Sequence, residues 1–332
     1  MSGFGSQFAP SVMRADHVDG RWSEPMSVAS DQLVLHPASH VLHYASSCFE
    51  GLKAFRGAGG GAHLFRPDMH IQRLQNSARH LCLPVPDADM VMAMLRQVVS
   101  EHENLLPEYP GALYLRPLLF ASDINIGSAG HASSNAILLV MASPVGDYFG
   151  GQDKTLRLFV ETEHARTTPD FGQVKTGGNY AAALQHVLRA RREQACDQVL
   201  FCPNDDVQET GAANFFLLHD RTLITKHLDG SILPGVTRDS LLQVAADLGL
   251  QVEQRALSVA ELLEKAPEGE AFLSGTAAVI TAVGELVSHG DTIVVGNGGV
   301  GGQTRSLRET LVQIQSGRSD AHRAWLVECC TN

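Results

Sequence analysis

The residues best suited to chemistry lie in the segment 173–180, which reads QVKTGGNY. Lys175 carries a primary amine, and a positioned lysine amine can form an imine with a carbonyl compound. Gly177 and Gly178 let the chain turn tightly, because glycine reaches backbone angles closed to other residues. The next residues, YAAALQHVLRARREQA, favour a helix, and we expect Asn179 to cap its first amides. The segment therefore predicts a lysine at the approach to a helix, with its amine directed into a site.

Lys175 would suit a carbonyl cofactor such as pyridoxal phosphate only if other segments bind the rest of that molecule. The phosphate needs helix-start amides or an arginine, the ring nitrogen needs a carboxylate, and the ring oxygen needs a hydrogen-bond donor. Without such groups, the ordinary interpretation is a solvated loop lysine, because most lysines are exposed.

Two segments offer backbone donors for a phosphate. Gly235, Val236 and Thr237 come shortly before the run SLLQVAADLG, and amides at the positive end of a helix bind anions. Residues 274–278, SGTAA, form a small-residue turn after an expected strand at 270–273. Taken singly, each segment is more often only a helix cap or a tight turn.

Glu209 is the candidate carboxylate. The surrounding sequence, VQETGAANF, is otherwise neutral and predicts a short strand. A carboxylate there could pair with a protonated pyridine nitrogen and stabilise its charge. A solvated glutamate is the alternative.

The composition disfavours several classes of protein. Hydrophobic residues make up 44% of the 332 residues and charged residues 18%, which is typical of globular domains. The formal net charge of −11 argues against nucleic acid or an anionic membrane as the main partner. The sequence shows neither a signal-peptide pattern nor an apolar run of membrane-spanning length, so we expect a cytoplasmic protein.

We expect no metal site. His36 and His40 could share a helical face, but Pro37 lies between them and no acidic residue is nearby. The six cysteines include no Cys-x-x-Cys pair, and we expect them to be reduced thiols.

The order of elements predicts an α+β fold in two domains. Residues 1–25 read as an extended arm, and residues 143–154 as a glycine- and proline-rich interdomain loop between a small domain, 1–142, and a large domain, 155–332. We also expect a hairpin at 48–66 and helices at 67–81, 87–105, 240–249 and 304–315, together with the helix that starts at residue 180. Strands are expected at 112–120, 136–142, 155–161, 198–202, 207–210, 214–218, 222–225 and 292–295. Strands and helices do not alternate strictly, which favours α+β over a doubly wound sheet.

Several segments together resemble the fold-type IV pyridoxal-phosphate enzymes, and in particular the branched-chain amino acid aminotransferases. In chain order they are HYASSCFEGLKAFRG, HLFRPDMHIQRL, LYLRPLLFAS, SPVGDYFG, KTGGNY, QETGAANFF, LDGSILPGVTRD and SGTAAVIT. The resemblance implies a D-amino acid aminotransferase-like fold of two mixed α/β domains and pyridoxal 5'-phosphate as cofactor. It also implies reversible transamination of L-leucine, L-isoleucine and L-valine with 2-oxoglutarate, giving branched-chain 2-oxo acids and L-glutamate. A homodimer or a larger homo-oligomer would be expected.

The resemblance implies roles for individual residues. Lys175 would bond to the cofactor and, once released, move a proton at the substrate α-carbon. Tyr180 would donate to the ring oxygen, and Glu209 would hold the ring nitrogen. The remaining cofactor contacts would come from Arg66, Val236, Thr237 and Thr276 at the phosphate and from Leu233 on the ring.

The resemblance also implies a set of substrate-binding residues. Tyr114 and the amides of Thr276 and Ala277 would hold the α-carboxylate, and Arg116 would meet the distal carboxylate of glutamate. The walls of an apolar pocket would be Phe49, Tyr44, Tyr148 and Tyr180. A pocket with aromatic walls and an arginine at its edge can accept both a branched side chain and a dicarboxylate. The loop carrying Tyr148 would close over the site.

The chain departs from the mammalian relatives after residue 276, where AAVI stands in place of a redox-active cysteine pair, so we expect no thiol regulation there.

D-amino acid aminotransferase and aminodeoxychorismate lyase share the fold and would retain Lys175 and Glu209, but FEGLKAFRG and YLRP favour the branched-chain enzyme. Residues 296–302, GNGGVGG, match the dinucleotide-binding pattern G-x-G-x-x-G, yet the rest of a Rossmann half is missing. A purely structural protein would not require this lysine and this glutamate together with two segments suited to binding an anion.

Overall fold

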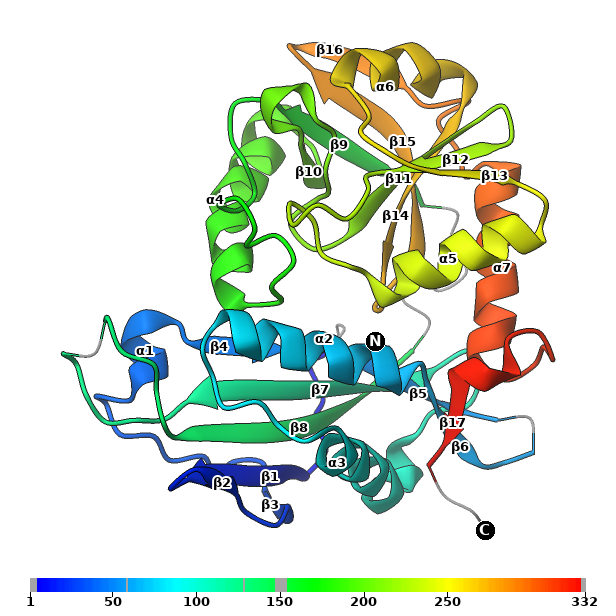
Figure 1. Cartoon of the computed structure of the whole chain (residues 1–332). Helices are drawn as coiled ribbons and strands as arrows, with labels where there is room; N and C mark the ends of the chain where they lie inside the picture. Colours follow the sequence, from blue (N-terminus) through cyan, green and yellow to red (C-terminus); the bar gives the residue numbers. More distant parts are fainter. Residues whose placement is uncertain (1–4, 58, 128, 147–153, 330–332) are drawn as a thin grey trace. The chain divides into compact units, whose positions relative to one another are not determined.

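The computed structural model describes residues 5–57, 59–127, 129–146 and 154–329. The chain divides into two compact units, whose elements are labelled in Figure 1. Unit 1 comprises residues 1–148, 174–177 and 313–332, and unit 2 comprises residues 149–173 and 178–312. Lys175 therefore belongs to unit 1, although the chain on both sides of its short segment belongs to unit 2.

Unit 1 is built on an antiparallel sheet. In its described part, nine strands run in the order β17-β6-β5-β7-β8-β1-β2, with β3 beside β1 and β4 beside β7. The long strands β7 (Ala112–Ala121) and β8 (Ala136–Val145) pair along their whole length. The other strands are β1 (Ser11–Val18), β2 (Arg21–Trp22), β3 (Met26–Ala29), β4 (Ser47–Phe49), β5 (Leu52–Arg56), β6 (Ala62–Phe65) and β17 (Leu326–Glu328).

Two helices pack on this sheet and close the core of unit 1 (Figure 1). α2 (Pro67–His80) begins with a proline, and α3 (Ala88–Glu101) is capped by the side chain of Asp87. Burial of their apolar faces with the strands is the main stabilising contribution to the unit. The helices predicted at 67–81 and 87–105 and the hairpin are confirmed. Unit 1 also contains α1 (His40–Tyr44) and single turns at Glu103–Leu105 and Arg323–Trp325.

The N-terminal region differs from the predicted extended arm. Its two strands, β1 and β2, join the sheet, where β1 pairs with β8 as well as with β2 and the following β3. Met13 and Ala15 on β1 are fully buried. The local sequence does not reveal this strand, because its pairing with β8 joins residues far apart along the chain.

Unit 2 is built on a mixed sheet. In its described part, eight strands run in the order β10-β9-β15-β14-β11-β12-β13, with β16 beside β15. β9 is parallel to β10 and β15, and β12 is parallel to β13. The strands are β9 (Leu156–Glu161), β10 (Gln198–Phe201), β11 (Asn214–His219), β12 (Thr222–Thr225), β13 (Gln251–Gln254), β14 (Glu270–Gly275), β15 (Val279–Ser288) and β16 (Asp291–Val294). The strand predicted at 207–210 is reduced to isolated bridges.

The helices of unit 2 complete its core. They are α4 (Gly177–Gln194), α5 (Val236–Asp247), α6 (Val259–Lys265) and α7 (Gly302–Gln315), with single turns at Pro203–Asp205 and Ala266–Glu268. Ala183 and Ala190 of α4 pack with Val199 and Phe201 of β10. Strands and helices without strict alternation make up both units, which confirms the α+β class.

The two units differ from the predicted domains in three places. Residues 174–177 were expected in the large domain but belong to unit 1. β8 continues through residues 143–145, which were expected in the interdomain loop, and residues 147–153 lie outside the described residues. Residues 313–332 belong to unit 1, because β17 pairs with β6. This pairing again joins distant parts of the chain.

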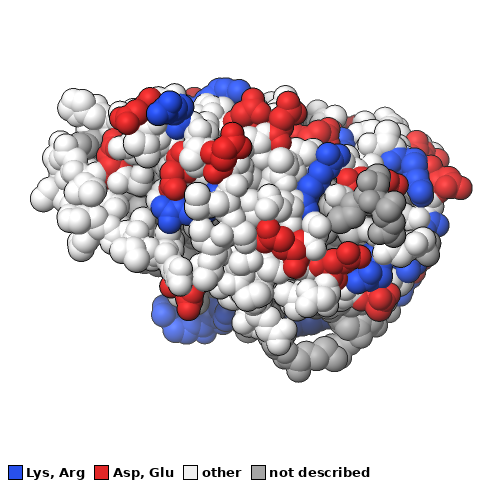
Figure 2. All heavy atoms as spheres, turned by 90° about the horizontal axis from the view of Figure 1, so that it is seen from below, with Lys and Arg blue, Asp and Glu red and all other residues white. Residues whose placement is uncertain are grey.

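Figure 2 shows one face of the molecule, on which acidic and basic side chains of the described residues are interspersed. Among the described residues, no helix is both long enough and apolar enough to cross a membrane.

Candidate active site

Lys175 is fixed through its backbone by two elements of unit 1. Its N–H donates to Ser77 Oγ on α2 at 3.1 Å, and its carbonyl accepts from the N–H of Phe49 at 3.0 Å. The hydroxyl of Thr176 donates to the Ser47 carbonyl at 2.7 Å. The amine of Lys175 lies 5.1 Å from the centre of the Phe49 ring, and the residue is half-buried. These contacts argue against a solvated loop lysine.

A buried ionic network lies beside this lysine in unit 1. Glu50 is 1% exposed and accepts from Arg73 Nε at 2.7 Å and Nη2 at 2.8 Å, and its Oε2 lies 2.8 Å from His70 Nδ1. His70, Arg73 and Ser77 follow one another at spacings of three and four residues, so they share one face of α2. That face holds both Glu50, next to Phe49, and the backbone of Lys175. Local sequence patterns did not reveal this network, although its charged residues stand within the segments FEGLK and HIQRL.

The network predicts a loss of stability in acid. Burial alone would raise the pKa of Glu50, but Arg73 and then His70 hold that pKa well below its usual range. A carboxyl group whose pKa is lowered by folding stabilises the protein above its unfolded pKa, and this contribution is lost as the pH falls toward the folded pKa. We therefore expect the urea midpoint to decrease as the pH is lowered below about 4.

Two variants test this assignment. Glu50→Gln leaves Arg73 buried without its counter-charge, and we expect it to lower the free energy of unfolding by about 3–5 kcal/mol. The double variant Glu50→Gln/Arg73→Met removes both charges and should cost less and show a weaker acid dependence. Equal losses for the single and double variants in urea unfolding would contradict the network.

Phe49, Tyr114 and Arg116 form one cluster in unit 1. Arg116 Nη2 donates to the Tyr114 hydroxyl at 3.0 Å, and the guanidinium carbon lies 4.7 Å from the centre of the Phe49 ring. The contact confirms that residues 114 and 116 share one face of their strand, as predicted. Opposite Tyr114, the hydroxyl of Ser143 is buried and has no hydrogen-bond partner among the described residues.

Arg66 stands at the N-cap of α2 in a left-handed conformation, with φ 48° and ψ 48°, and is 8% exposed. Its guanidinium carbon lies 4.6 Å from the centre of the Trp325 ring, and its N–H donates to the Trp325 carbonyl at 2.7 Å. Arginine rarely adopts such a φ, so the site imposes this conformation.

Tyr44, a predicted wall of the substrate pocket, donates its hydroxyl to the Ile126 carbonyl. Tyr148 lies outside the described residues.

In unit 2, Glu209 is buried and held by several donors. Its Oε1 lies 2.6 Å from Arg166 Nη2 and accepts from the N–H of Leu233 at 3.0 Å. Its Oε2 accepts from Asn214 Nδ2 at 2.8 Å. The side chains of Arg166 and Glu209 are 5% and 3% exposed. Glu209 is therefore no solvated glutamate, and Arg166, for which the sequence indicated no role, is its ionic partner.

The start of α5 lies close to the Glu209 network. α5 begins at Val236, and no side chain caps it in the described structure. Val236 and Thr237 are buried. A Cβ at Gly235 would lie 2.1 Å from Asn214 Oδ1, so only glycine allows the helix start to approach Asn214. The anion-binding segment expected here therefore lies at a helix N-terminus that no described side chain caps.

The second predicted anion seat is the turn 276–278 between β14 and β15. Thr276 and Ala277 in this turn are half-buried. Ser274 just before it pairs with Asn214 of the neighbouring strand, and its hydroxyl is buried without a hydrogen-bond partner among the described residues. The turn thus begins beside Asn214, one of the residues that hold Glu209.

The predicted cap at Asn179 is wrong. α4 begins at Gly177, so Asn179 lies inside the first turn, where its Nδ2 donates to the Phe171 carbonyl at 2.9 Å. The preceding glycines enter the helix instead of forming a separate turn. Tyr180 is half-buried on the same helical turn.

The dinucleotide alternative finds no support in the structure. At the start of α7, the carboxylate of Glu270 accepts from Gln303 N–H at 3.1 Å and from Thr304 N–H at 2.7 Å. A Cβ at Gly301 would lie 2.0 Å from the Glu270 side chain. The amides that would bind a pyrophosphate thus hold a carboxylate, which repels phosphate. Gly301 of this run leaves the space that the Glu270 side chain occupies.

The sequence profile of amino-transferase class IV matches residues 47–286, which is most of the chain. The chain belongs to the class IV aminotransferases. Branched-chain-amino-acid transaminase 1 of Bacillus subtilis is 38% identical to this aminotransferase over 336 residues, covering 98% of this chain and 94% of the relative. The match confirms the predicted family.

Solved structures agree with this assignment. The branched-chain amino acid aminotransferase of Escherichia coli superposes on this class IV aminotransferase with a TM-score of 0.79 at 29% identity, over 97% of this chain and 100% of that chain. The branched-chain aminotransferase of the archaeon Thermoproteus uzoniensis, solved with norvaline, gives a TM-score of 0.77 at 27% identity, over 96% of this chain and 100% of that chain. The fold-type IV architecture predicted from the sequence is confirmed.

Proposed function

We propose that this class IV aminotransferase catalyses reversible, pyridoxal 5'-phosphate-dependent transamination of L-leucine, L-isoleucine and L-valine with 2-oxoglutarate. The observation that carries the proposal is the anchored Lys175, which lies beside the Phe49–Tyr114–Arg116 cluster of unit 1. The names of the relatives support the choice of substrates. We further propose a cytoplasmic homodimer or larger homo-oligomer.

The residue types of the predicted cofactor-binding set would suit pyridoxal phosphate. Glu209, held by Arg166, would bind the ring nitrogen, and Tyr180 would donate to the ring oxygen. Phosphate contacts would come from Arg66, Val236, Thr237 and Thr276, and Leu233 would pack on the ring. When bound, the cofactor supplies an electron-withdrawing ring that acidifies the α-carbon of the amino acid. Lys175 Nζ would remove and return the proton at that carbon.

The substrate would be bound by the remaining residues of the predicted set. Tyr114 and the amides of Thr276 and Ala277 would hold the α-carboxylate. Phe49 offers an apolar surface for a branched side chain, and Arg116, stacked on that ring, offers a guanidinium for the distal carboxylate of glutamate. Tyr44, Tyr148 and Tyr180 remain predicted walls of the pocket.

Steady-state kinetics of Arg116→Gln test the proposal. We expect the KM for 2-oxoglutarate to increase by about 10- to 100-fold, because a charged hydrogen bond is lost. The KM for L-leucine should change much less, and Arg96→Gln on the exposed side of α3 serves as the control. Equal changes for the two substrates would argue against Arg116 as the dicarboxylate contact. A preference of the wild-type enzyme for D-alanine would favour the D-specific alternative.

Gly51 is required by the position of Tyr114. A Cβ at Gly51 would lie 1.9 Å from the Tyr114 hydroxyl oxygen, so Gly51→Ala must displace the tyrosine or the segment after Phe49. We expect kcat/KM for L-leucine to fall at least about tenfold, because misplaced binding groups lose transition-state contacts. Gly61→Ala is the matched control, since a Cβ there meets no atom within 4 Å. Unchanged kinetics for Gly51→Ala would contradict the requirement for glycine at this position.

Peroxide should have little effect on the activity. The turn after Thr276 lacks cysteine, and burial raises the pKa of the Cys48 and Cys202 thiols, which keeps them protonated and unreactive. We expect the activity before and after mild peroxide treatment to agree. A large loss that a thiol reductant restores would contradict this prediction.

A further inference from the structure

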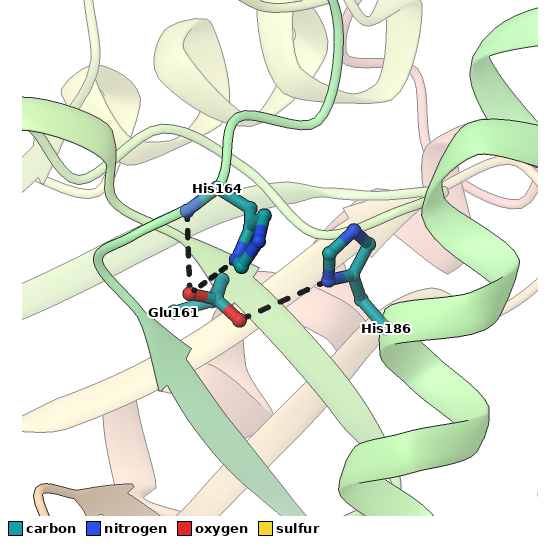
Figure 3. A group of neighbouring side chains, drawn as sticks. All are labelled: Glu161, His164 and His186. Carbon is teal, nitrogen blue, oxygen red and sulfur yellow. Dashed lines mark hydrogen bonds and ion pairs between the residues drawn. The ribbon is translucent and has the colours of Figure 1, made fainter.

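A second group of ionisable side chains lies in unit 2, apart from the residues assigned above (Figure 3). Glu161 ends β9, His164 lies in the following loop, and His186 lies on α4. Each offers one potential ligand atom, and the three atoms lie within 4.8 Å of one another. Figure 3 shows both imidazole rings directed toward the same carboxylate.

We propose that Glu161, His164 and His186 form a binding site for a divalent transition-metal ion, with Zn²⁺ as the ion that fits best. Two imidazoles and a carboxylate are a common zinc ligand set, with water in the fourth position. Tetrahedral bonds of about 2.1 Å place ligand atoms about 3.4 Å apart. Glu161 Oε1 lies 3.3 Å from His164 Nδ1, and Oε2 lies 3.9 Å from His186 Nδ1. Both separations are close to this spacing.

Two of these ligands are already oriented by the fold. Glu161 Oε1 accepts from the backbone N–H groups of Glu163 at 2.9 Å and His164 at 3.3 Å. The ring of His186 packs edge-on against Phe201, with ring centres 5.9 Å apart. His186 Nδ1 is buried and has no hydrogen-bond partner among the described residues. A metal bond would satisfy this nitrogen, and supporting contacts of this kind strengthen metal binding.

Arg189 is the cation that competes for this carboxylate. Its Nη2 lies 2.9 Å from Glu161 Oε2, and its side chain is 42% exposed. An ion pair of this exposure is weak and is screened by salt, so the arginine can turn into solvent when a metal ion binds. Removing Arg189 should therefore strengthen metal binding, whereas removing a ligand should weaken it.

Titration of the chelator-treated full-length holoenzyme with Zn²⁺ against a chromophoric indicator tests the site. We expect one ion bound per chain, with the dissociation constant raised at least about tenfold by His164→Gln or His186→Gln. Arg189→Gln should lower it by about threefold or more. His227→Gln is the matched control, because His227 is as exposed as His164 and also lies near one carboxylate.

Co²⁺ provides a second readout that does not depend on activity. Absorption bands of a tetrahedral ion with nitrogen and oxygen ligands should appear in the wild type and be lost in His186→Gln. Three results would overturn the site: no bound ion, an affinity in His186→Gln within twofold of the wild type, or the thiolate bands of an ion bound at cysteine.

Discussion

Lys175→Ala is expected to remain folded but to lose transamination, with kcat falling by at least about 10³-fold. The backbone of this residue is held by Ser77 and Phe49, and neither hydrogen bond requires the lysine side chain. The fold should therefore persist, while the amine that moves the α-proton is gone.

Mass spectrometry separates this loss from a failure to fold. After treatment with the cofactor and borohydride, the wild-type chain should gain the mass of one cofactor, and Lys175→Ala should not. Lys265→Ala is a suitable control, because Lys265 pairs with Glu261 on α6 and should retain both labelling and activity. Cofactor mass attached to the Lys175→Ala chain would mean that another lysine performs this role.

Glu209→Ala is expected to lose both stability and rate. It leaves Arg166 buried without its counter-charge, which should lower the free energy of unfolding by about 3–5 kcal/mol. It also removes the negative charge assigned to the ring nitrogen, so proton removal should become slower by about 10²-fold. With leucine deuterated at the α-carbon, the isotope effect on kcat should therefore increase.

The double variant Glu209→Gln/Arg166→Met separates these two effects. It removes the buried guanidinium together with its partner, so urea unfolding should show most of the lost stability restored. The activity should stay low, because the charge at the ring nitrogen is still missing. Recovery of activity along with stability would show that Glu209 is only a structural residue.

Local sequence patterns were sufficient to predict those elements that nearby residues alone determine. α2 starts at Pro67, where proline at the first position defines the start locally, and it ends within a residue of its predicted end. β7 was identified by its apolar run, and the contact between Tyr114 and Arg116 followed from its alternation. The helix predicted at 240–249 is α5, but α5 begins four residues earlier, at Val236.

Contacts between distant residues could not be predicted in this way. β1 and β17 are stabilised by pairing with β8 and β6, which lie far away in the sequence. The Arg166–Glu209 pair and the Glu50–His70–Arg73 network also join separate segments. At Asn179, a tertiary hydrogen bond to Phe171 overrides the capping preference of asparagine. In each case the deciding interaction is absent from the local sequence.

The most direct test of the proposed function is the absorption spectrum of the cofactor-loaded enzyme before and after addition of L-leucine, with D-alanine in parallel. We predict that L-leucine, but not D-alanine, removes the absorption band of the lysine-bound cofactor and that 2-oxoglutarate restores this band. A response to D-alanine alone would retain Lys175 but contradict the branched-chain L-specific assignment, and the lack of any visible band after loading would contradict the cofactor itself.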